Sequence, residues 1–142
     1  MNWNENQIVL DLGNDFTIDK VFFFKDIIVD RGSHYSVFAA PITSREEVKD
    51  IQKSLKKQLY FDKATHNSFA FRIKTQTGIL EGKNDDGEIW AGMCILRELE
   101  RENAVNMIVV ITRYFWWVHL QSDRFKHIIN GVKILFEKVK KS

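Results

Sequence analysis

The order of apolar and polar positions along the chain predicts four or five strands and three helices. β-Branched and aromatic residues concentrate in residues 20–30, 35–40 and 107–112, residues 69–74 alternate strictly, and a shorter strand is expected near residues 79–81. Apolar residues recur at three- and four-residue steps in residues 44–59 and 88–101 and again from Ser122 onward, which is typical of amphipathic helices. The predicted order is strand, strand, helix, strand, strand, helix, strand, helix.

Local patterns define three of these elements more closely. Ser44 is the expected N-cap of the first helix, and Glu47 three residues later completes a capping box. The apolar stripe of that helix consists of Val48, Ile51, Leu55 and Leu59. The strand at residues 69–74 places its residues at 69, 71 and 73 on one face. The continuous apolar run at residues 107–112 indicates a central strand that is buried on both faces.

These elements predict an α+β fold, a two-layer α/β sandwich in which a four- to five-stranded mixed sheet packs one face against three helices. Residues 1–19 are expected to form an N-terminal extension, and residues 20–142 a single domain. The length of 142 residues suits one domain that buries a substantial core.

Composition narrows the class of protein. The net charge of +2 argues against a disordered acidic chain and against a strongly basic nucleic-acid binder. Cys94 is the single cysteine, which excludes an internal disulfide and a multi-thiolate zinc site and fits a reducing compartment. Since no apolar run approaches the roughly 20 residues that span a bilayer, a soluble, cytoplasmic protein without membrane contact is expected.

The charge is unevenly distributed along the chain. Residues 1–104 carry a net charge of −3 and residues 105–142 a net charge of +5, with Lys138, Lys140 and Lys141 close to the C-terminal end. Cations near a helix C-terminus offset its partial negative charge, which is the preferred interpretation. A tail that contacts phosphate groups is the alternative.

The sequence Asp85-Asp86-Gly87-Glu88 precedes the second predicted helix. Three carboxylates in four residues are a possible site for a hard divalent cation, but the alternating ligands of an EF-hand loop are absent. The structural interpretation is preferred: Asp86 caps the helix, Gly87 relaxes the backbone, and Glu88 complements the positive end of the helix.

No residue is assigned to catalysis, to a metal or to a cofactor. His66 is the histidine considered as a general base or a metal ligand. No two histidines in the chain, however, have the i, i+4 spacing of a zinc motif. Cys94 lies among apolar helix residues, where a thiolate is disfavoured. A metal-assisted hydrolase using His66, Asp85, Asp86 and Glu88 is therefore the least favoured of the function classes.

Aromatic residues follow the central strand in the sequence Arg113-Tyr114-Phe115-Trp116-Trp117. Such a run is compatible with a stacking platform for single-stranded bases or with a protein-binding hot spot. Continuation of the strand with alternate rings buried is preferred, because four adjacent aromatic rings are costly to expose to water.

Five short motifs, taken in order, resemble the IMPACT/YigZ family and its eukaryotic IMPACT branch. They are Asp30-Arg31-Gly32-Ser33-His34-Tyr35, Ala64-Thr65-His66-Asn67, Asp85-Asp86-Gly87-Glu88 with Ala91-Gly92, Thr112-Arg113-Tyr114-Phe115, and Asp123-Arg124-Phe125-Lys126-His127-Ile128. The resemblance implies a fold like the second domain of a small-subunit ribosomal protein. It also implies a role in translation control, since IMPACT proteins bind the ribosome-associated activator of the amino-acid-starvation kinase, which phosphorylates initiation factor two. No firm catalytic activity is associated with the family.

The chain departs from the family pattern in two places. Trp116 and Trp117 stand where family members carry two glycines, and Gln121 replaces the next glycine. Residues 1–25, ahead of the region that resembles the family, are too short for the RWD domain that usually accompanies IMPACT proteins, so a version lacking that domain is expected.

The motifs are expected to converge into one cluster near the start of the second helix, either as a binding site or as a fold-fixing network. Arg113 is expected to pair with Asp85 or Glu88, and His66 to donate to a carboxylate. The cluster consists of Arg31, Ser33, His66, Asn67, Asp85, Asp86, Gly87, Glu88, Arg113 and Tyr114. A candidate recognition loop consists of Trp116, Trp117, Asp123 and Arg124.

Two function classes follow. The first is a cytoplasmic regulator of translation that binds a protein partner in the starvation-kinase pathway. The alternative is an RNA- or ribosome-binding module, suggested by the ribosomal kin of the fold, the +5 charge of residues 105–142 and the tryptophans.

Overall fold

A five-stranded antiparallel sheet forms the centre of the molecule. The structure, a computed structural model, describes residues 14–114 and 123–142. The strands are β1 (Phe22–Asp30), β2 (Ser33–Pro41), β3 (His66–Lys74), β4 (Ile79–Asn84) and β5 (Met107–Tyr114), and they are arranged in the order β1-β2-β5-β3-β4. Each neighbouring pair is antiparallel, so the predicted mixed sheet is wrong in this respect. The α+β fold class is confirmed.

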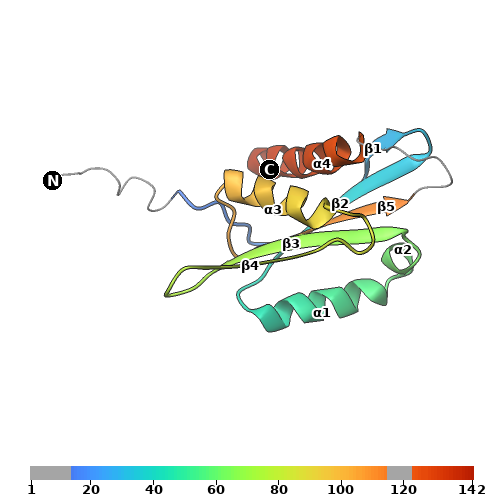
Figure 1. The fold of residues 1–142 in the computed structure, drawn as a ribbon. Helices are drawn as coiled ribbons and strands as arrows, with labels where there is room; N and C mark the ends of the chain where they lie inside the picture. Colours follow the sequence, from blue (N-terminus) through green and yellow to red (C-terminus); the bar gives the residue numbers. More distant parts are fainter. Residues whose placement is uncertain (1–13, 115–122) are drawn as a thin grey trace.

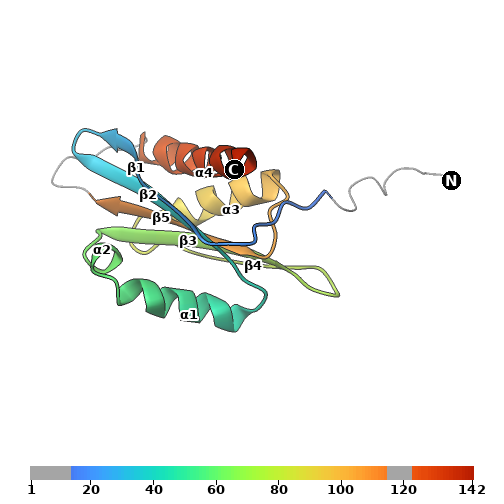
Figure 2. The ribbon, with the colours of Figure 1, turned by 180° about the vertical axis from the view of Figure 1, so that it is seen from behind.

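Helices cover both faces of this sheet. They are α1 (Arg45–Lys56), the four-residue α2 (Leu59–Asp62), α3 (Ala91–Arg101) and α4 (Asp123–Lys141). Helices α3 and α4 lie on one face, and α1 and α2 lie on the other (Figures 1 and 2). One apolar cluster lies under α3 and α4, and a second lies between the sheet and α1 and α2.

The strand sequences explain why both faces are covered. Alternate residues of β3 point to opposite sides: Phe69, Phe71 and Ile73 belong to the cluster under α1, and Ala70 belongs to the cluster under α3. Strand β5 is buried from Met107 to Arg113 and contributes to both clusters. A strand that is apolar on both faces needs cover on both, so the helices are divided between the two faces and not confined to one.

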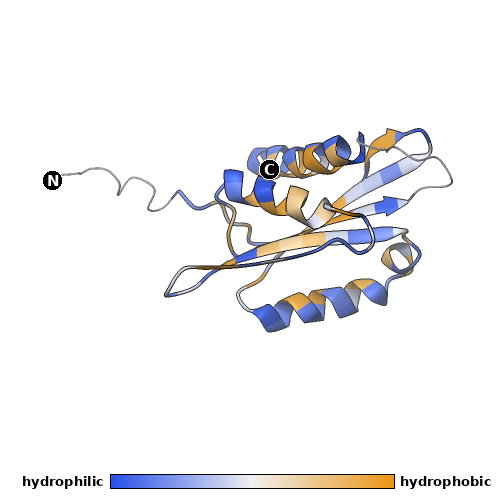
Figure 3. Cartoon of the chain, in the orientation of Figure 1, coloured by the Kyte–Doolittle hydropathy of each residue, from blue (hydrophilic) through white to orange (hydrophobic). Residues whose placement is uncertain are grey.

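Helix α1 begins as predicted and ends earlier. The Ser44 hydroxyl accepts the backbone N–H of Glu47 (3.3 Å), and the Glu47 carboxylate accepts the N–H of Thr43 (2.7 Å). The helix ends at Lys56, and Gln58 is extended, so Leu59 starts α2 and is 71% exposed. Phe61 packs into the core in its place. Figure 3 shows hydrophilic and hydrophobic bands along α1, as expected for a helix with one buried side.

The segment before β1 is attached to the domain by main-chain and aromatic contacts. Phe16 forms a parallel bridge to Ala104, and its N–H donates to Asn103 (2.9 Å). Its ring meets that of Phe136 in α4 edge to face, with 5.3 Å between ring centroids. Among the described residues, no helix has the length and apolar character needed to cross a membrane.

Candidate functional site

The family-like motifs meet where β3 begins, β5 ends and the loop before α3 returns to the sheet. His66 in β3 is the register partner of Arg113 in β5, and Arg113 is also paired with Tyr35 in β2. The loop at residues 85–90 lies against the start of β3 through hydrogen bonds to residues 66–68. We call this arrangement the motif cluster; it comprises Ser33, residues 66–68, residues 85–88 and Arg113.

A buried ion pair lies at the centre of the motif cluster. Arg113 Nη1 donates to Glu88 Oε2 at 2.6 Å, and the two side chains are 6% and 4% exposed. Arg113 Nη2 also lies 3.4 Å from Ser33 Oγ, and the guanidinium carbon is 5.5 Å from the centroid of the Tyr35 ring. The prediction that Arg113 pairs with Asp85 or Glu88 is confirmed, with Glu88 as the partner. The pair joins the loop to β5 and β2.

Asp85, and not Asp86, caps helix α3. Asp85 Oδ1 accepts the N–H of Gly92 (2.8 Å), and Oδ2 accepts the N–H of Trp90 (3.1 Å). The predicted cap at Asp86 and the predicted helix start at Glu88 are therefore wrong. Helix α3 starts only at Ala91, because the Glu88 side chain is drawn into the core by Arg113 and Trp90 adopts a left-handed conformation with φ of 71°.

Asp86 instead fixes the loop to the first residues of β3. Its Oδ2 accepts the N–H of Asn67 (2.7 Å), and its backbone oxygen lies 2.8 Å from His66 Nδ1. His66 Nδ1 therefore lies against a main-chain oxygen. From the sequence, a hydrogen bond from His66 to a carboxylate was predicted at this place. Gly87 has φ of 86°, and a Cβ on it would come within 3.2 Å of His66 Nδ1, so glycine suits this turn on both grounds.

The Asn67 side chain links two further elements, and the neighbouring Ser68 holds the acidic loop. Its Nδ2 donates to the backbone oxygen of Phe61 in α2 (2.8 Å), and its Oδ1 accepts the hydroxyl of Thr112 in β5 (2.9 Å). Ser68 Oγ donates to the backbone oxygen of Asp85 (2.7 Å). The polar groups of the motif cluster are thus used to hold chain segments together.

Arg31 and Tyr114 belong to different surroundings. Arg31 is exposed and pairs with Asp30 and with Asp123 at the start of α4, so it ties the β1–β2 hairpin to that helix. The Tyr114 hydroxyl donates to the backbone oxygen of Tyr60 in α2. Arg31 and Tyr114 were predicted to belong to the cluster. The bonds described here instead connect them to residues outside the motif cluster.

Of the candidate recognition loop, the structure describes Asp123 and Arg124. Asp123 is engaged by Arg31, and the Arg124 guanidinium carbon lies 4.9 Å from the centroid of the adjacent Phe125 ring. Trp116, Trp117 and Gln121 lie outside the described residues.

Asp30 is the carboxylate with the clearest electrostatic perturbation. Hydrogen bonds from Arg31 and then from His127 hold the pKa of Asp30 at about 2, below its ordinary value. His127 Nε2 lies 2.8 Å from Asp30 Oδ2.

Cys94 lies in helix α3, where burial raises the pKa of its thiol. In the described part of the chain, no three His, Cys, Asp or Glu side chains are grouped so that they could hold a metal ion.

The sequence prediction missed two exposed residues beside the motif cluster. Ile89 and Trp90 are 59% and 62% exposed, although large apolar residues are usually sheltered. Trp90 is held by the bond from its N–H to Asp85 in a backbone conformation that is unfavourable for residues other than glycine. A signal was available in the sequence, because Ile89 and Trp90 are large apolar residues that directly follow the acidic motif.

Comparison with known proteins identifies the family. A family model of the Impact N-terminal domain matches residues 31–135, which contain all five motifs except the first residue of the first one. The chain belongs to the Impact N-terminal domain family. The resemblance predicted from the motifs is therefore confirmed.

Relatives within the Impact family support this assignment. The chain is 38% identical over 114 residues to Protein IMPACT of Oryctolagus cuniculus, which covers 78% of the chain, and 39% identical over 105 residues to the IMPACT homolog of Saccharomyces cerevisiae, which covers 72%. It is 31% identical over 138 residues to Protein IMPACT-A of Xenopus tropicalis, which covers 94%. The matched segment spans 36%, 41% and 43% of those three relatives.

Two solved structures are similar to the Impact domain described above. The two-domain translational regulator Yih1 has a TM-score of 0.57 and 33% identity, and the match covers 82% of this chain and 46% of that chain. The crystal structure of a hypothetical protein has a TM-score of 0.71 at 18% identity and covers 86% of this chain and 63% of that one, which shows a shared fold.

Proposed function

We propose that this Impact domain regulates translation during amino-acid starvation by binding a protein, the ribosome-associated activator of the kinase that phosphorylates initiation factor two. Family membership and the likeness to the translational regulator Yih1 support a role in translation. The binding event takes place in the cytoplasm, where ribosomes and the kinase act.

One observation carries the binding mode: a rigid loop presents two large apolar side chains to solvent. Ile89 and Trp90 are both more than half exposed and follow directly on Glu88, which is buried against Arg113. Aromatic residues that protrude from a fixed backbone are typical protein-binding hot spots, because little conformational entropy is lost when they are covered.

The remaining polar groups of the motif cluster support binding over chemistry. The carboxylates of Asp85 and Asp86 each accept main-chain N–H groups, and that of Glu88 accepts Arg113. These side chains are occupied in shaping the loop. The loop in turn positions Ile89 and Trp90 beside helix α3.

A capture experiment tests the proposal. The immobilised domain is incubated with extract from starved cells, and the activator is quantified with a specific antibody. We expect Ile89→Ala/Trp90→Ala to reduce capture by about tenfold or more, the loss expected for a hot spot. When the unaltered domain is added to a reconstituted kinase reaction, phosphorylation of initiation factor two is expected to fall. The double variant is expected to leave that phosphorylation unchanged.

The matched control is Val29→Ala/Ile79→Ala, which also removes two exposed apolar side chains, 57% and 40% exposed, from the edge strands β1 and β4. This control should capture the activator like the unaltered domain. Failure of the unaltered domain to capture the activator would refute the partner. Equal capture by the Ile89/Trp90 variant would refute the surface.

A further inference from the structure

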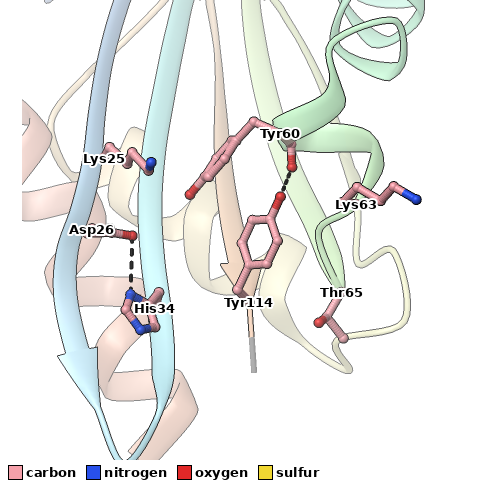
Figure 4. Close-up of a pocket in the computed structure, with 7 residues that line it drawn as sticks. All are labelled: Lys25, Asp26, His34, Tyr60, Lys63, Thr65 and Tyr114. Carbon is pink, nitrogen blue, oxygen red and sulfur yellow. Dashed lines mark hydrogen bonds and ion pairs between the residues drawn. The ribbon is translucent and has the colours of Figure 1, made fainter. Parts of the chain in front are cut away.

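A pocket outside the motif cluster lies between β1, β2 and the segment that contains α2. Its volume is about 530 Å³, within the range of ligand-binding pockets. Figure 4 shows side chains from β1 and β2 facing two tyrosine rings from α2 and β5. The lining residues are Lys25, Asp26, His34, Tyr60, Lys63, Thr65 and Tyr114.

A bulge in β1 places charged residues at this pocket. The register between β1 and β2 shifts between Phe24 and Ile28, and Asp26 has φ of 51°, an uncommon value for a residue other than glycine. The Asp26 N–H, released from the ladder, donates to Ser36 Oγ in β2 at 2.8 Å. Bulges redirect side chains and are frequent beside functional sites. This one directs Lys25 and Asp26 to the pocket.

Two tyrosines form a rigid aromatic wall. The rings of Tyr60 and Tyr114 are 4.9 Å apart between centroids and tilted by 43°. Both hydroxyls are fixed: that of Tyr60 is 2.7 Å from Ser36 Oγ, and that of Tyr114 donates to the backbone oxygen of Tyr60. The same Ser36 hydroxyl thus joins the wall to the bulge. A preformed wall binds a planar group without the cost of ordering it.

The charges at the mouth of the pocket favour an anion. Lys25 and Lys63 are exposed, and Lys25 Nζ lies 5.2 Å from the centroid of the Tyr60 ring. The single carboxylate, Asp26, has His34 Nδ1 at 3.4 Å from its Oδ1. Two lysines and one carboxylate, which already has an imidazole beside it, therefore line the pocket, and Figure 4 shows the Lys63 side chain extending away from the two tyrosine rings. A ligand that matches these features combines a flat aromatic ring with a negatively charged group.

We propose that this pocket binds a nucleotide, with its base against Tyr60 and Tyr114 and its phosphate at Lys25, while Lys63 adds positive charge at the rim of the pocket. Stacking on aromatic rings and contacts from lysine to phosphate are the two main sources of affinity in single-strand binding sites. The nucleotide is either free or part of single-stranded RNA. This inference is independent of the protein-binding surface at Ile89 and Trp90.

Calorimetric titration with defined probes tests the proposal. At 50 mM salt, AMP and UMP are expected to bind, whereas adenosine, which lacks the phosphate, and ribose 5-phosphate, which lacks the base, should each bind about tenfold more weakly. A uridine octamer distinguishes the sources. Tighter binding of the octamer than of UMP, with a steep decrease at higher salt, identifies RNA, and equal binding identifies a free nucleotide.

Matched variants locate the site. Lys25→Ala/Lys63→Ala should weaken AMP binding about tenfold or more, and Lys49→Ala/Lys53→Ala, which removes the same charge from the exposed face of α1, should leave it unchanged. Tyr60→Leu should weaken AMP binding about tenfold, and Tyr60→Phe, which keeps the ring, should largely retain it. Circular dichroism verifies that each variant is folded.

The proposal is overturned if neither the mononucleotides nor the octamer bind at 50 mM salt, or if the two lysine pairs behave alike. It is also overturned if Tyr60→Leu binds AMP as tightly as the unaltered domain. The Ile89→Ala/Trp90→Ala variant should keep its AMP affinity while losing activator capture, so failure of one proposal is distinguishable from failure of the other.

Discussion

Arg113 illustrates how one buried charge organises its surroundings. Its guanidinium meets a carboxylate from the loop before α3, a hydroxyl from β2 and the face of a tyrosine ring. A charge removed from water is costly unless it is paired, so Arg113 and Glu88 depend on each other. The shape of the loop, including the exposure of Trp90, follows from that dependence.

Breaking this pair is expected to destabilise the domain by about 3–5 kcal/mol, because one charge is left buried without its partner. We expect this cost for Glu88→Leu and for Arg113→Met measured separately by urea unfolding. The double variant Glu88→Leu/Arg113→Met should lose much less than the sum of the two. Strictly additive losses would show that the two side chains contribute independently.

Asp30 is expected to make the stability of the domain depend on pH under acidic conditions. Its pKa is about 2 in the folded domain, against roughly 3.9 for a free aspartate, so the folded state favours the ionised form. Its stabilising contribution is complete above pH 4 and is lost as the pH falls from about 4 to 2. Urea midpoints of the unaltered domain and of Asp30→Asn should differ at pH 6 and converge near pH 2.

The exposed residue Asp50 on α1 provides the control for this measurement. Asp50→Asn removes the same charge without removing the bonds to Arg31 and His127. A difference for Asp30→Asn that stays constant between pH 6 and pH 2 would contradict the assigned role of Asp30.

At the scale of the element, periodicity predicted most of the structure, and contacts between residues far apart in the sequence decided the rest. The alternation in β3 and the N-cap at Ser44 depend on residues close in sequence, and both are confirmed. The start of α3 depends on Arg113, 25 residues away from Glu88, which withdraws Glu88 from the helix. No periodic pattern contains that information.

The candidate site, too, could be predicted only in part from the sequence. Motif order was enough to predict that Arg113 and the acidic loop meet, but not which carboxylate pairs with Arg113 and which one caps α3. That choice depends on the path of the backbone through Gly87 and Trp90, both at positive φ. The pocket at Tyr60 could not be predicted either, since it requires the bulge at Asp26 and the short helix α2.

The Phe71 ring of β3 packs directly against Gly82 of β4. Gly82 is the register partner of Phe71, and a Cβ on Gly82 would overlap the Phe71 ring, which is buried. Gly82→Ala is therefore expected to lower the free energy of unfolding by about 1–3 kcal/mol through overpacking. Thermal unfolding monitors the change. Lys83→Ala, at the exposed neighbouring position of β4, is the control and should change stability by less than about 0.5 kcal/mol.

At the scale of the whole molecule, the sheet separates two apolar clusters that share its strands. The cluster under α3 and α4 also receives the segment before β1, because Phe16 packs against Phe136. Residues far apart in sequence therefore close one end of this layer: Phe16 bridges to Ala104 and touches the last helix. The segment contributes to the stability of the domain and not only to its length.

Removing the Phe16 ring should make this contribution measurable. Phe16→Ala is expected to destabilise the domain by about 2 kcal/mol, less than a fully buried phenylalanine because the ring is only partly buried. Chemical unfolding measures the loss. The exposed Val21→Ala serves as the control and should change stability by less than about 0.5 kcal/mol. Equal effects of the two substitutions would show that the segment is not anchored.

The bulge in β1 has a consequence for the solution behaviour of the domain. Strand β1 is an edge of the sheet, and an unbroken edge is a template on which a second copy adds its own strand. Here the regular ladder runs for three residues, Phe22 to Phe24, and resumes for three more, Ile28 to Asp30. Neither stretch is long enough to recruit a neighbour securely. The distortion that shapes a pocket thus also protects this protein from edge-to-edge aggregation.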